Sequence, residues 1–233
     1  MLRLIQLTLR LAFRLLYNEM AWTYDFVSWF VSAGQWRSWQ RAALPYLRGR
    51  KVLEIAHGTG NLLLDLTALG FEPVGFDLSK AMGRIARRKL RARGVPDSVP
   101  LVCGRVQTLP FASDAFPSLL ATFPTEFVVD QQAIAEFRRV LQPGGVIVFV
   151  PVARITSLAV ADRLAEWLFR VTGQSSENWF APLTGRYTAA GFTTRVEQVK
   201  LPSRSTPAGR STVTVIVAEK KPSVETTRRV VST

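Results

Sequence analysis

Apolar and polar residues recur with two periods along the central part of the chain and predict a repeated order of strand and helix. Short apolar runs bounded by glycine and proline are typical of buried strands, and apolar positions three and four residues apart are typical of helices. The predicted strands lie near residues 51–56, 73–77, 100–103, 118–122, 145–150, 193–200 and 211–219. The predicted helices lie near residues 61–69, 79–93, 130–141, 157–171 and 182–190.

This alternation predicts an α/β fold with a doubly wound, mostly parallel sheet. Pro143-Gly144-Gly145 is interpreted as the turn into the fifth strand. The last two strands follow each other without a helix between them, so we expect them to pair antiparallel. The tail at residues 221–233 is polar, has no apolar period, and is expected to be disordered.

The N-terminal segment predicts a helix over residues 2–20 with one polar face. Arg3, Gln6, Arg10, Arg14 and Asn18 fall at spacings of three and four. A wide apolar sector beside three arginines is typical of a helix that lies in a membrane interface. Packing on its own domain or across a dimer is the alternative.

Residues 20–47 are rich in tryptophan, with Trp22, Trp29, Trp36 and Trp39. Aromatic side chains at helical spacing usually pack in a core. They also suit an interfacial anchor or a cover over an apolar substrate.

Composition sets the remaining bounds. The 233 residues suffice for one α/β domain and are too few for two of full size. No run approaches the roughly 18 apolar residues of a membrane-spanning helix, and no cleavage site follows a clean apolar run, so a signal peptide is not expected. The formal net charge of +13 favours anionic partners. The lone histidine, His57, excludes a histidine cluster, so no metal is expected. Cys103 follows an apolar run and is expected to be buried.

The stretch from Val52 to Leu66 carries the strongest local signal. An apolar strand enters a glycine-containing turn, a helix leaves it, and the next strand ends in Asp77, 23 residues after Glu54. Glycines let a backbone approach a nucleoside cofactor, and a carboxylate on the second strand binds ribose hydroxyls. Dinucleotide-binding folds use the same parts, so this pattern by itself does not choose the cofactor.

The residue pattern of these segments resembles that of the class I S-adenosylmethionine-dependent methyltransferases. In that family an acidic residue ends the first strand and a GxGxG loop follows. Glu54 holds the acidic place, Gly58 and Gly60 match, and Ala56 departs from the pattern. LPFASDAF (residues 109–116) and EFRRVLQPGGVIVFV (residues 136–150) look like the later signatures of the family.

The resemblance implies S-adenosyl-L-methionine as the cofactor and a seven-stranded sheet with one reversed strand. It implies a methyltransferase domain over residues 48–220 under an N-terminal cap over residues 1–47. The cofactor-binding residues that it implies are Glu54, Ala56, His57, Gly58, Gly60, Asp77, Leu78, Arg105, Val106 and Thr122. Arg105 stands where the family usually has an acid, which weakens the match at the adenine.

Candidates for the acceptor site follow the fourth strand, because ligands of open α/β sheets lie at the carboxyl ends of the strands. They are Thr122, Phe123, Pro124 and Glu126. Tyr24 belongs to a YD dipeptide that resembles quinone-biosynthesis C-methyltransferases and bacterial phospholipid N-methyltransferases, and this resemblance implies that Tyr24 is a cofactor-lid or substrate contact. The candidate catalytic residues are therefore Tyr24, Glu126 and His57. Glu126 is equally suited to starting the next helix.

The segment from Lys80 to Arg93 holds seven basic residues and no acid, and Arg84, Arg87, Arg88 and Arg91 share a helix face. A solvated face is one interpretation, and contact with anionic lipid headgroups or another polyanion is the other.

The sequence favours a methyltransferase that acts on a lipid-like or membrane-associated small molecule, such as a phospholipid amine or a quinone precursor. A soluble acceptor, with the N-terminal helix as lid or dimer element, is an alternative, and so is a non-catalytic binding protein. Nucleic acid is disfavoured as a substrate because no Asn/Asp-Pro-Pro-Tyr tetrapeptide is present. A cytoplasmic location is expected, with peripheral contact with the inner face of the membrane. The atom methylated and the oligomeric state stay open.

Overall fold

The computed structural model describes residues 25, 28–29, 32, 34–95, 97–155, 180–202 and 211–221. The predictions made for helices 2–20 and 157–171, for Tyr24, and for the tail beyond residue 221 lie outside the described residues.

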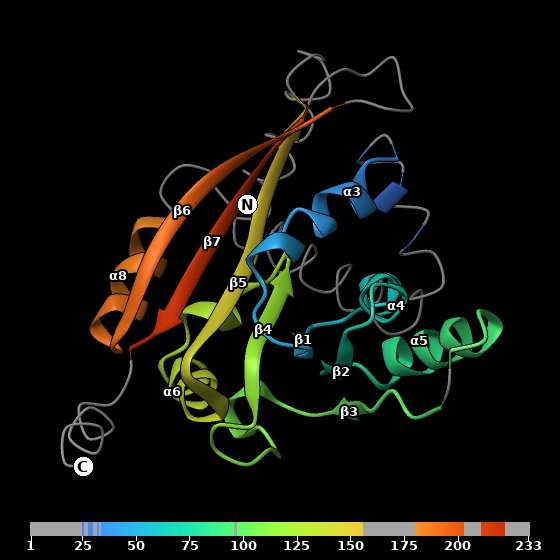
Figure 1. Cartoon of the computed structure of the whole chain (residues 1–233), viewed down its shortest axis with the longest axis horizontal. Helices are drawn as coiled ribbons and strands as arrows, with labels where there is room; N and C mark the ends of the chain where they lie inside the picture. Colours follow the sequence, from blue (N-terminus) through green and yellow to red (C-terminus); the bar gives the residue numbers. More distant parts are fainter. Residues whose placement is uncertain are drawn as a thin grey trace, which may run out of the picture.

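The described strands form one seven-stranded sheet in the order β3-β2-β1-β4-β5-β7-β6 (Figure 1). β7 runs antiparallel to both of its neighbours, and the remaining pairs are parallel. The predicted fold, with its one reversed strand, is thereby confirmed. The bounds are β1 (Lys51–Ile55), β2 (Glu72–Asp77), β3 (Leu101–Cys103), β4 (Phe116–Thr122), β5 (Leu141–Ile155), β6 (Phe192–Leu201) and β7 (Ser211–Lys220).

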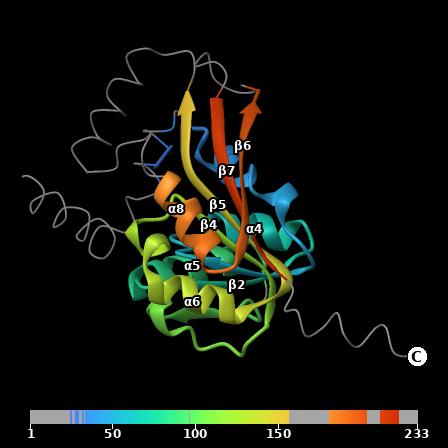
Figure 2. The same cartoon turned by 90° about the vertical axis from the view of Figure 1, so that its left-hand side faces the viewer.

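Helices cover both faces of the sheet (Figures 1 and 2). One face carries α3 (Trp36–Arg41), α4 (Asn61–Ala68) and α5 (Lys80–Ala92). The other carries α6 (Gln131–Val140) and α8 (Phe180–Ala189). Short 3-10 helices are η2 (Leu44–Tyr46), η3 (Val106–Thr108) and η4 (Glu126–Val129).

Side chains that alternate along the strands build one apolar core under each helical layer. In β4, Leu119 and Ala121 point into the core under α6 and α8, and Leu120 points into the core under α3 and α4. Simple alternation would send Phe123 to the same side as Ala121. Its left-handed backbone, with φ of 49°, instead carries the ring to the α3 side, where it stacks on Trp36 at 4.1 Å between centroids.

The start of β5 corrects the predicted turn. Pro143-Gly144-Gly145 lies inside the strand, and the pairing with β4 jumps from Phe116↔Leu141 to Ser118↔Val146. Proline has no N–H to give to a ladder, so the surplus residues bulge out of it. Gly144 takes up the bend with φ of 73°.

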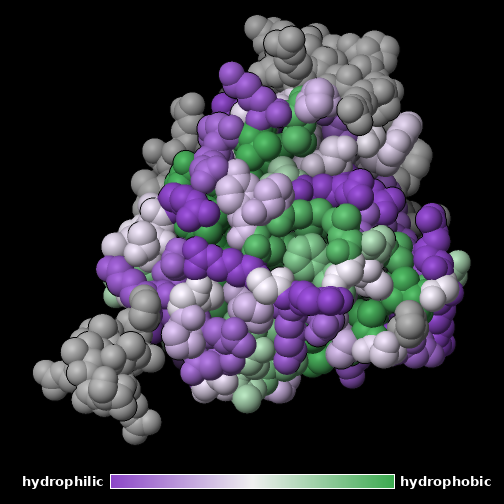
Figure 3. Space-filling model, in the orientation of Figure 1, coloured by the Kyte–Doolittle hydropathy of each residue, from purple (hydrophilic) through white to green (hydrophobic). Residues whose placement is uncertain are grey.

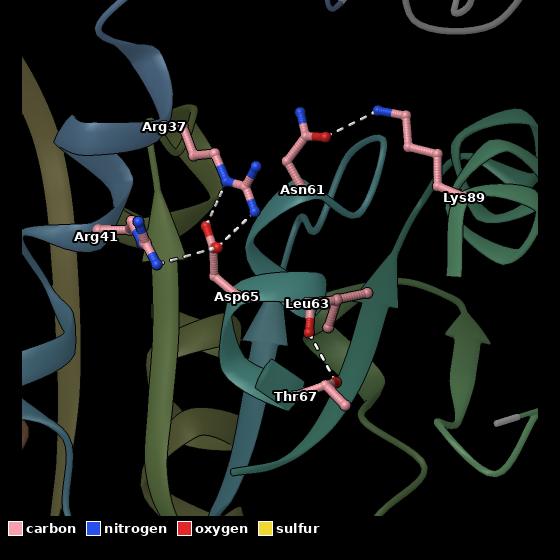
Figure 4. Close-up of polar contacts among 7 residues, drawn as sticks. All are labelled: Arg37, Arg41, Asn61, Leu63, Asp65, Thr67 and Lys89. Carbon is pink, nitrogen blue, oxygen red and sulfur yellow. Dashed lines mark hydrogen bonds and ion pairs between the residues drawn. The ribbon is translucent and has the colours of Figure 1, made fainter. Parts of the chain in front are cut away.

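An ion pair fixes α3 on α4. Arg37 donates from Nε to Asp65 Oδ2 at 2.8 Å and from Nη2 to Oδ1 at 2.6 Å, and Arg41 Nη2 lies 3.5 Å from Oδ1 (Figure 4). Asp65 is 2% exposed. A buried carboxylate needs such partners, because removing it from water is costly. The pair therefore holds α3 against α4, the helix that follows β1.

We expect Arg37→Met to lower the free energy of unfolding by about 1–3 kcal/mol, because it leaves a buried carboxylate with one distant cation. Urea denaturation measures this change. Arg50→Met is the matched control, since the Arg50–Glu72 pair is 74% and 65% exposed and such pairs contribute about 0–1 kcal/mol. Equal losses in the two variants would contradict the role given to Asp65.

Candidate functional site

The carboxylate of Asp77 joins the two loops at the carboxyl ends of β1 and β2. Its Oδ2 accepts the backbone N–H of Gly58 at 2.9 Å, and its Oδ1 accepts that of Ser79 at 2.8 Å. The N–H of Ala56 donates to the carbonyl of Phe76 at 2.8 Å. The loop after β1 is therefore held against the last two residues of β2.

The two glycines of this loop serve different purposes. Gly60 has φ of 79°, and a Cβ there would lie 2.8 Å from Cβ of Ala86, so a side chain would push α5 away. Gly58 has φ of 55°, and nothing lies within 4 Å of the place of its Cβ. Its backbone is thus open to a ligand.

Ala56 replaces glycine at a position that needs a left-handed backbone. Its φ is 56°, a conformation that costs an L residue about 1–2 kcal/mol. The departure from the family pattern therefore stores strain at the site.

Glu54, at the end of β1, is a buried carboxyl with a free oxygen. It is 1% exposed, and Oε2 has no hydrogen-bond partner. Burial and the nearby charges of Asp77 and Asp65 raise the pKa of Glu54 well above its usual value. A carboxyl held in this way is suited to a cationic group of a ligand.

His57 shapes the glycine loop. It is 4% exposed, and its Nδ1 lies 2.9 Å from the carbonyl of Gly58, so Nδ1 carries a proton and donates. Burial lowers the pKa of His57 despite the charge of Asp77. The ring packs beside Gly75, where a Cβ would lie 2.9 Å from it. This packing favours a structural role over the base role that the sequence left open.

Asp25 is a residue that the sequence analysis missed. It accepts hydrogen bonds from Thr59 Oγ1 at 2.6 Å and Asn61 Nδ2 at 3.0 Å, and it pairs with Lys89. Lys89 also donates to Asn61 Oδ1 at 2.9 Å (Figure 4). Burial acts to raise the pKa of Asp25, but these hydrogen bonds and the Lys89 charge lower it overall. The signal was the YD dipeptide, from which its neighbour Tyr24 was chosen.

The residues after β2 and β3 form the rim of the site. Leu78 is 70% exposed, and Arg105 is also exposed. Val106 opens η3 and is half-buried. Cys103 was expected to be buried and is exposed, because it ends a three-residue edge strand, and its thiol donates to the carbonyl of Leu78 at 3.4 Å.

At the carboxyl end of β4 the candidate acceptor residues separate. Thr122 Oγ1 accepts from Gln40 Nε2 at 3.0 Å, and Phe123 also faces α3. Pro124 is buried, and Glu126 is exposed in the first turn of η4, a position compatible with both roles considered for it. Gln40 was not predicted. It is 8% exposed, and its Oε1 has no hydrogen-bond partner.

Two further features bear on chemistry. Among the described residues, no group of three or more His, Cys, Asp or Glu side chains is placed to hold a metal ion. In the same part of the chain, the helices fall short of the length and apolarity needed to cross a bilayer.

Comparison with known proteins agrees with this geometry. A family model described as the ubiE/COQ5 methyltransferase family matches residues 11–179. The chain belongs to the ubiE/COQ5 methyltransferase family. It is an S-adenosyl-L-methionine-dependent methyltransferase, which confirms the predicted enzyme class and cofactor.

This methyltransferase is similar to two relatives of known name and to one solved structure. Demethylmenaquinone methyltransferase of Symbiobacterium thermophilum is 29% identical over 181 residues, which cover 74% of this chain and 71% of that protein. Ubiquinone/menaquinone biosynthesis C-methyltransferase UbiE of Geotalea daltonii is 32% identical over 142 residues, which cover 58% of this chain and 60% of that protein, less than two thirds of its length. The structure of geranyl diphosphate C-methyltransferase from Streptomyces coelicolor, solved with S-adenosyl-L-homocysteine, matches with a TM-score of 0.55 at 14% identity. The match covers 78% of this chain and 77% of that chain, and at this identity it shows a shared fold alone.

We expect Ala56→Gly to raise the free energy of unfolding of the methyltransferase by about 1 kcal/mol, because glycine relieves the left-handed strain. Ala135→Gly is the matched control. Ala135 is exposed inside α6, where glycine should lower the same free energy by about 1 kcal/mol. Chemical denaturation of both variants measures the effect, and a loss of stability in both would show that Ala56 is unstrained.

A second prediction concerns Glu54. Its folded-state pKa lies above the unfolded value near 4.3, so the unfolded chain loses the proton first and stability falls as the pH rises past that value. Glu54→Gln should therefore raise the free energy of unfolding at pH 7 by about 1 kcal/mol or more, and the gain should vanish below about pH 4. Glu126→Gln, at an exposed position, should change it little at either pH. A destabilised Glu54→Gln at pH 7 would refute the raised pKa.

Proposed function

We propose that this methyltransferase transfers a methyl group from S-adenosyl-L-methionine to a ring carbon of a lipid-like quinone precursor. The printed names of the relatives support the acceptor class, since one acts on demethylmenaquinone and the other is a C-methyltransferase of quinone biosynthesis. The observation that carries the proposal is the buried Glu54 carboxyl with a free oxygen, beside an open glycine backbone and the Asp77 carboxylate.

The residues present fit the cofactor. Glu54 is suited to the ammonium of the methionine part, and the backbone at Gly58 leaves room for close approach. Each oxygen of Asp77 keeps a lone pair beyond its backbone hydrogen bond, which suits ribose hydroxyls. Leu78 follows Asp77 directly and is exposed, so its side chain is suited to packing against a flat base. When bound, the cofactor supplies a methyl group already activated by a sulfonium.

The chain then has to align the acceptor and keep water away. Phe123 stacks on Trp36, and Trp39 lies at 6.2 Å from Phe123 between centroids, so an aromatic wall stands at the end of β4. Figure 3 shows hydrophobic side chains gathered near the middle of the face that is seen in Figure 1. Such a wall favours a flat, apolar ring.

A proton has to leave the acceptor when its ring gains a methyl group. His57 is packed into the glycine loop, so it is poorly placed to take this proton. Glu126 follows β4 and is exposed, and we assign it the role of proton acceptor from a ring hydroxyl.

The test is methyl transfer from radiolabelled S-adenosyl-L-methionine to a demethylated menaquinone precursor in detergent. Label should enter the organic phase and the quinone ring. Glu54→Gln should weaken cofactor binding, measured by calorimetry, at least tenfold while the fold gains stability. The loss of binding could then not be attributed to a loss of folded protein. This variant is sharper than Asp77→Ala, because Asp77 also holds the loop in place.

Glu126→Gln should lower kcat and leave cofactor affinity unchanged. Glu197→Gln is its control, because Glu197 lies on the edge strand β6, where it accepts a hydrogen bond from Tyr46 and pairs with Arg195. Label confined to a water-soluble acceptor would overturn the acceptor class, and an unchanged kcat in Glu126→Gln would overturn the role of that residue.

A further inference from the structure

Six of the seven basic residues in the segment from Lys80 to Arg93 lie within α5 and fall into two groups, and the seventh, Arg93, caps the end of that helix. Three have partners. Arg87 donates to the backbone carbonyls of Asp97 at 3.2 Å and Val99 at 2.8 Å, and Arg91 pairs with the Asp97 carboxylate at 2.8 Å. Lys89 pairs with Asp25. These three contacts belong to the fold and the site.

The other group forms a stripe along α5. Lys80, Arg84 and Arg88 are exposed, are spaced by four residues, and make no ion pair with any residue that the structure describes. We call these three residues the basic stripe. At 1.5 Å per residue it extends over about 12 Å.

The basic stripe points away from the domain. The buried residues of α5 are Met82, Ala86 and Leu90, which also recur every four residues. The two series are offset by two positions, which is about 200° around a helix. The stripe is therefore on the opposite side of α5 from the packed face.

The stripe also begins at the cofactor edge of the sheet. Ser79 caps α5 through its side chain, and its own N–H donates to Asp77. Lys80 thus follows directly on the proposed ribose site. The carboxyl ends of β1, β2 and β4 share this edge, because the three strands are parallel neighbours.

We propose that the basic stripe docks this methyltransferase on the anionic headgroups of a phospholipid bilayer, with the cofactor edge beside the membrane. The inference rests on the proposed function in one respect, since a lipid-like acceptor resides in a bilayer. Charge complementarity supports it, because three outward cations in a line match a flat layer of phosphates and guanidinium groups bind phosphate bidentately. No acidic residue interrupts the segment.

The experiment is sedimentation of the full-length chain with two kinds of vesicle, phosphatidylcholine alone and phosphatidylcholine with phosphatidylglycerol. The variant is Arg84→Gln with Arg88→Gln. The control is Lys200→Gln with Lys221→Gln. It removes the same charge from exposed positions on the β6–β7 side of the sheet, opposite to β3. A basic residue at an anionic surface is worth about 1 kcal/mol, or about fivefold in affinity.

We expect the wild-type chain to bind the anionic vesicles, the stripe variant to bind them about thirtyfold more weakly, and the control to lose much less. Added salt should weaken the wild-type binding. Equal losses in variant and control, or no wild-type binding, would overturn the proposal. So would a stripe variant that loses binding to duplex DNA but keeps its binding to vesicles.

Turnover of a short-tailed acceptor in detergent separates this inference from the proposed function. The stripe variant should retain wild-type turnover there, because neither arginine touches the site. Failure of that assay in the wild-type chain would count against the proposed function, whereas failure of the vesicle assay by itself would count against the stripe.

Discussion

The site depends on one carboxylate that bridges two loops. Asp77 accepts one backbone N–H from the glycine loop and one from its own loop, so the carboxyl ends of β1 and β2 are held as a unit. Everything that faces a ligand at this edge is placed relative to that bridge, including the open backbone at Gly58 and the buried carboxyl of Glu54. Because the bridging oxygens keep lone pairs, the same group can bind a ligand without giving up its structural bonds.

Ion pairs attach α3 and Asp25 to the helices that follow β1 and β2. Asp65 in α4 accepts hydrogen bonds from Arg37 of α3, and Lys89 of α5 donates to Asn61 at the start of α4 (Figure 4). Asn61 and Lys89 both also donate to Asp25. Both attachments join segments that are remote in sequence. The Arg37–Asp65 pair resists opening, because the buried Asp65 carboxylate would lose its main partner. An attachment of this kind is suited to keeping water out during methyl transfer.

Local pattern was enough to predict the alternation of strands and helices, and it put Glu54, Gly58 and Asp77 at the ends of the first two strands, because period and glycine position are properties of short segments. It failed where distant contacts decide. The bulge in β5 is set by its pairing with β4. The ring of Phe123 turns against the alternation because α3 offers Trp36. Asp25 was passed over because its partners, Thr59 in the glycine loop and Lys89 in α5, are brought together only in the folded chain.

The two edges of the sheet have a consequence for how copies of the chain meet. β3 at one edge has three residues, too short a row of free backbone groups to template another strand. β6 at the other edge is longer, but Arg195, Glu197 and Lys200 stand along it, and the first two pair at 3.0 Å with 49% and 40% of their side chains exposed. An incoming strand would have to bury these charges, so the molecule is protected against edge-to-edge aggregation even when it is crowded on a surface.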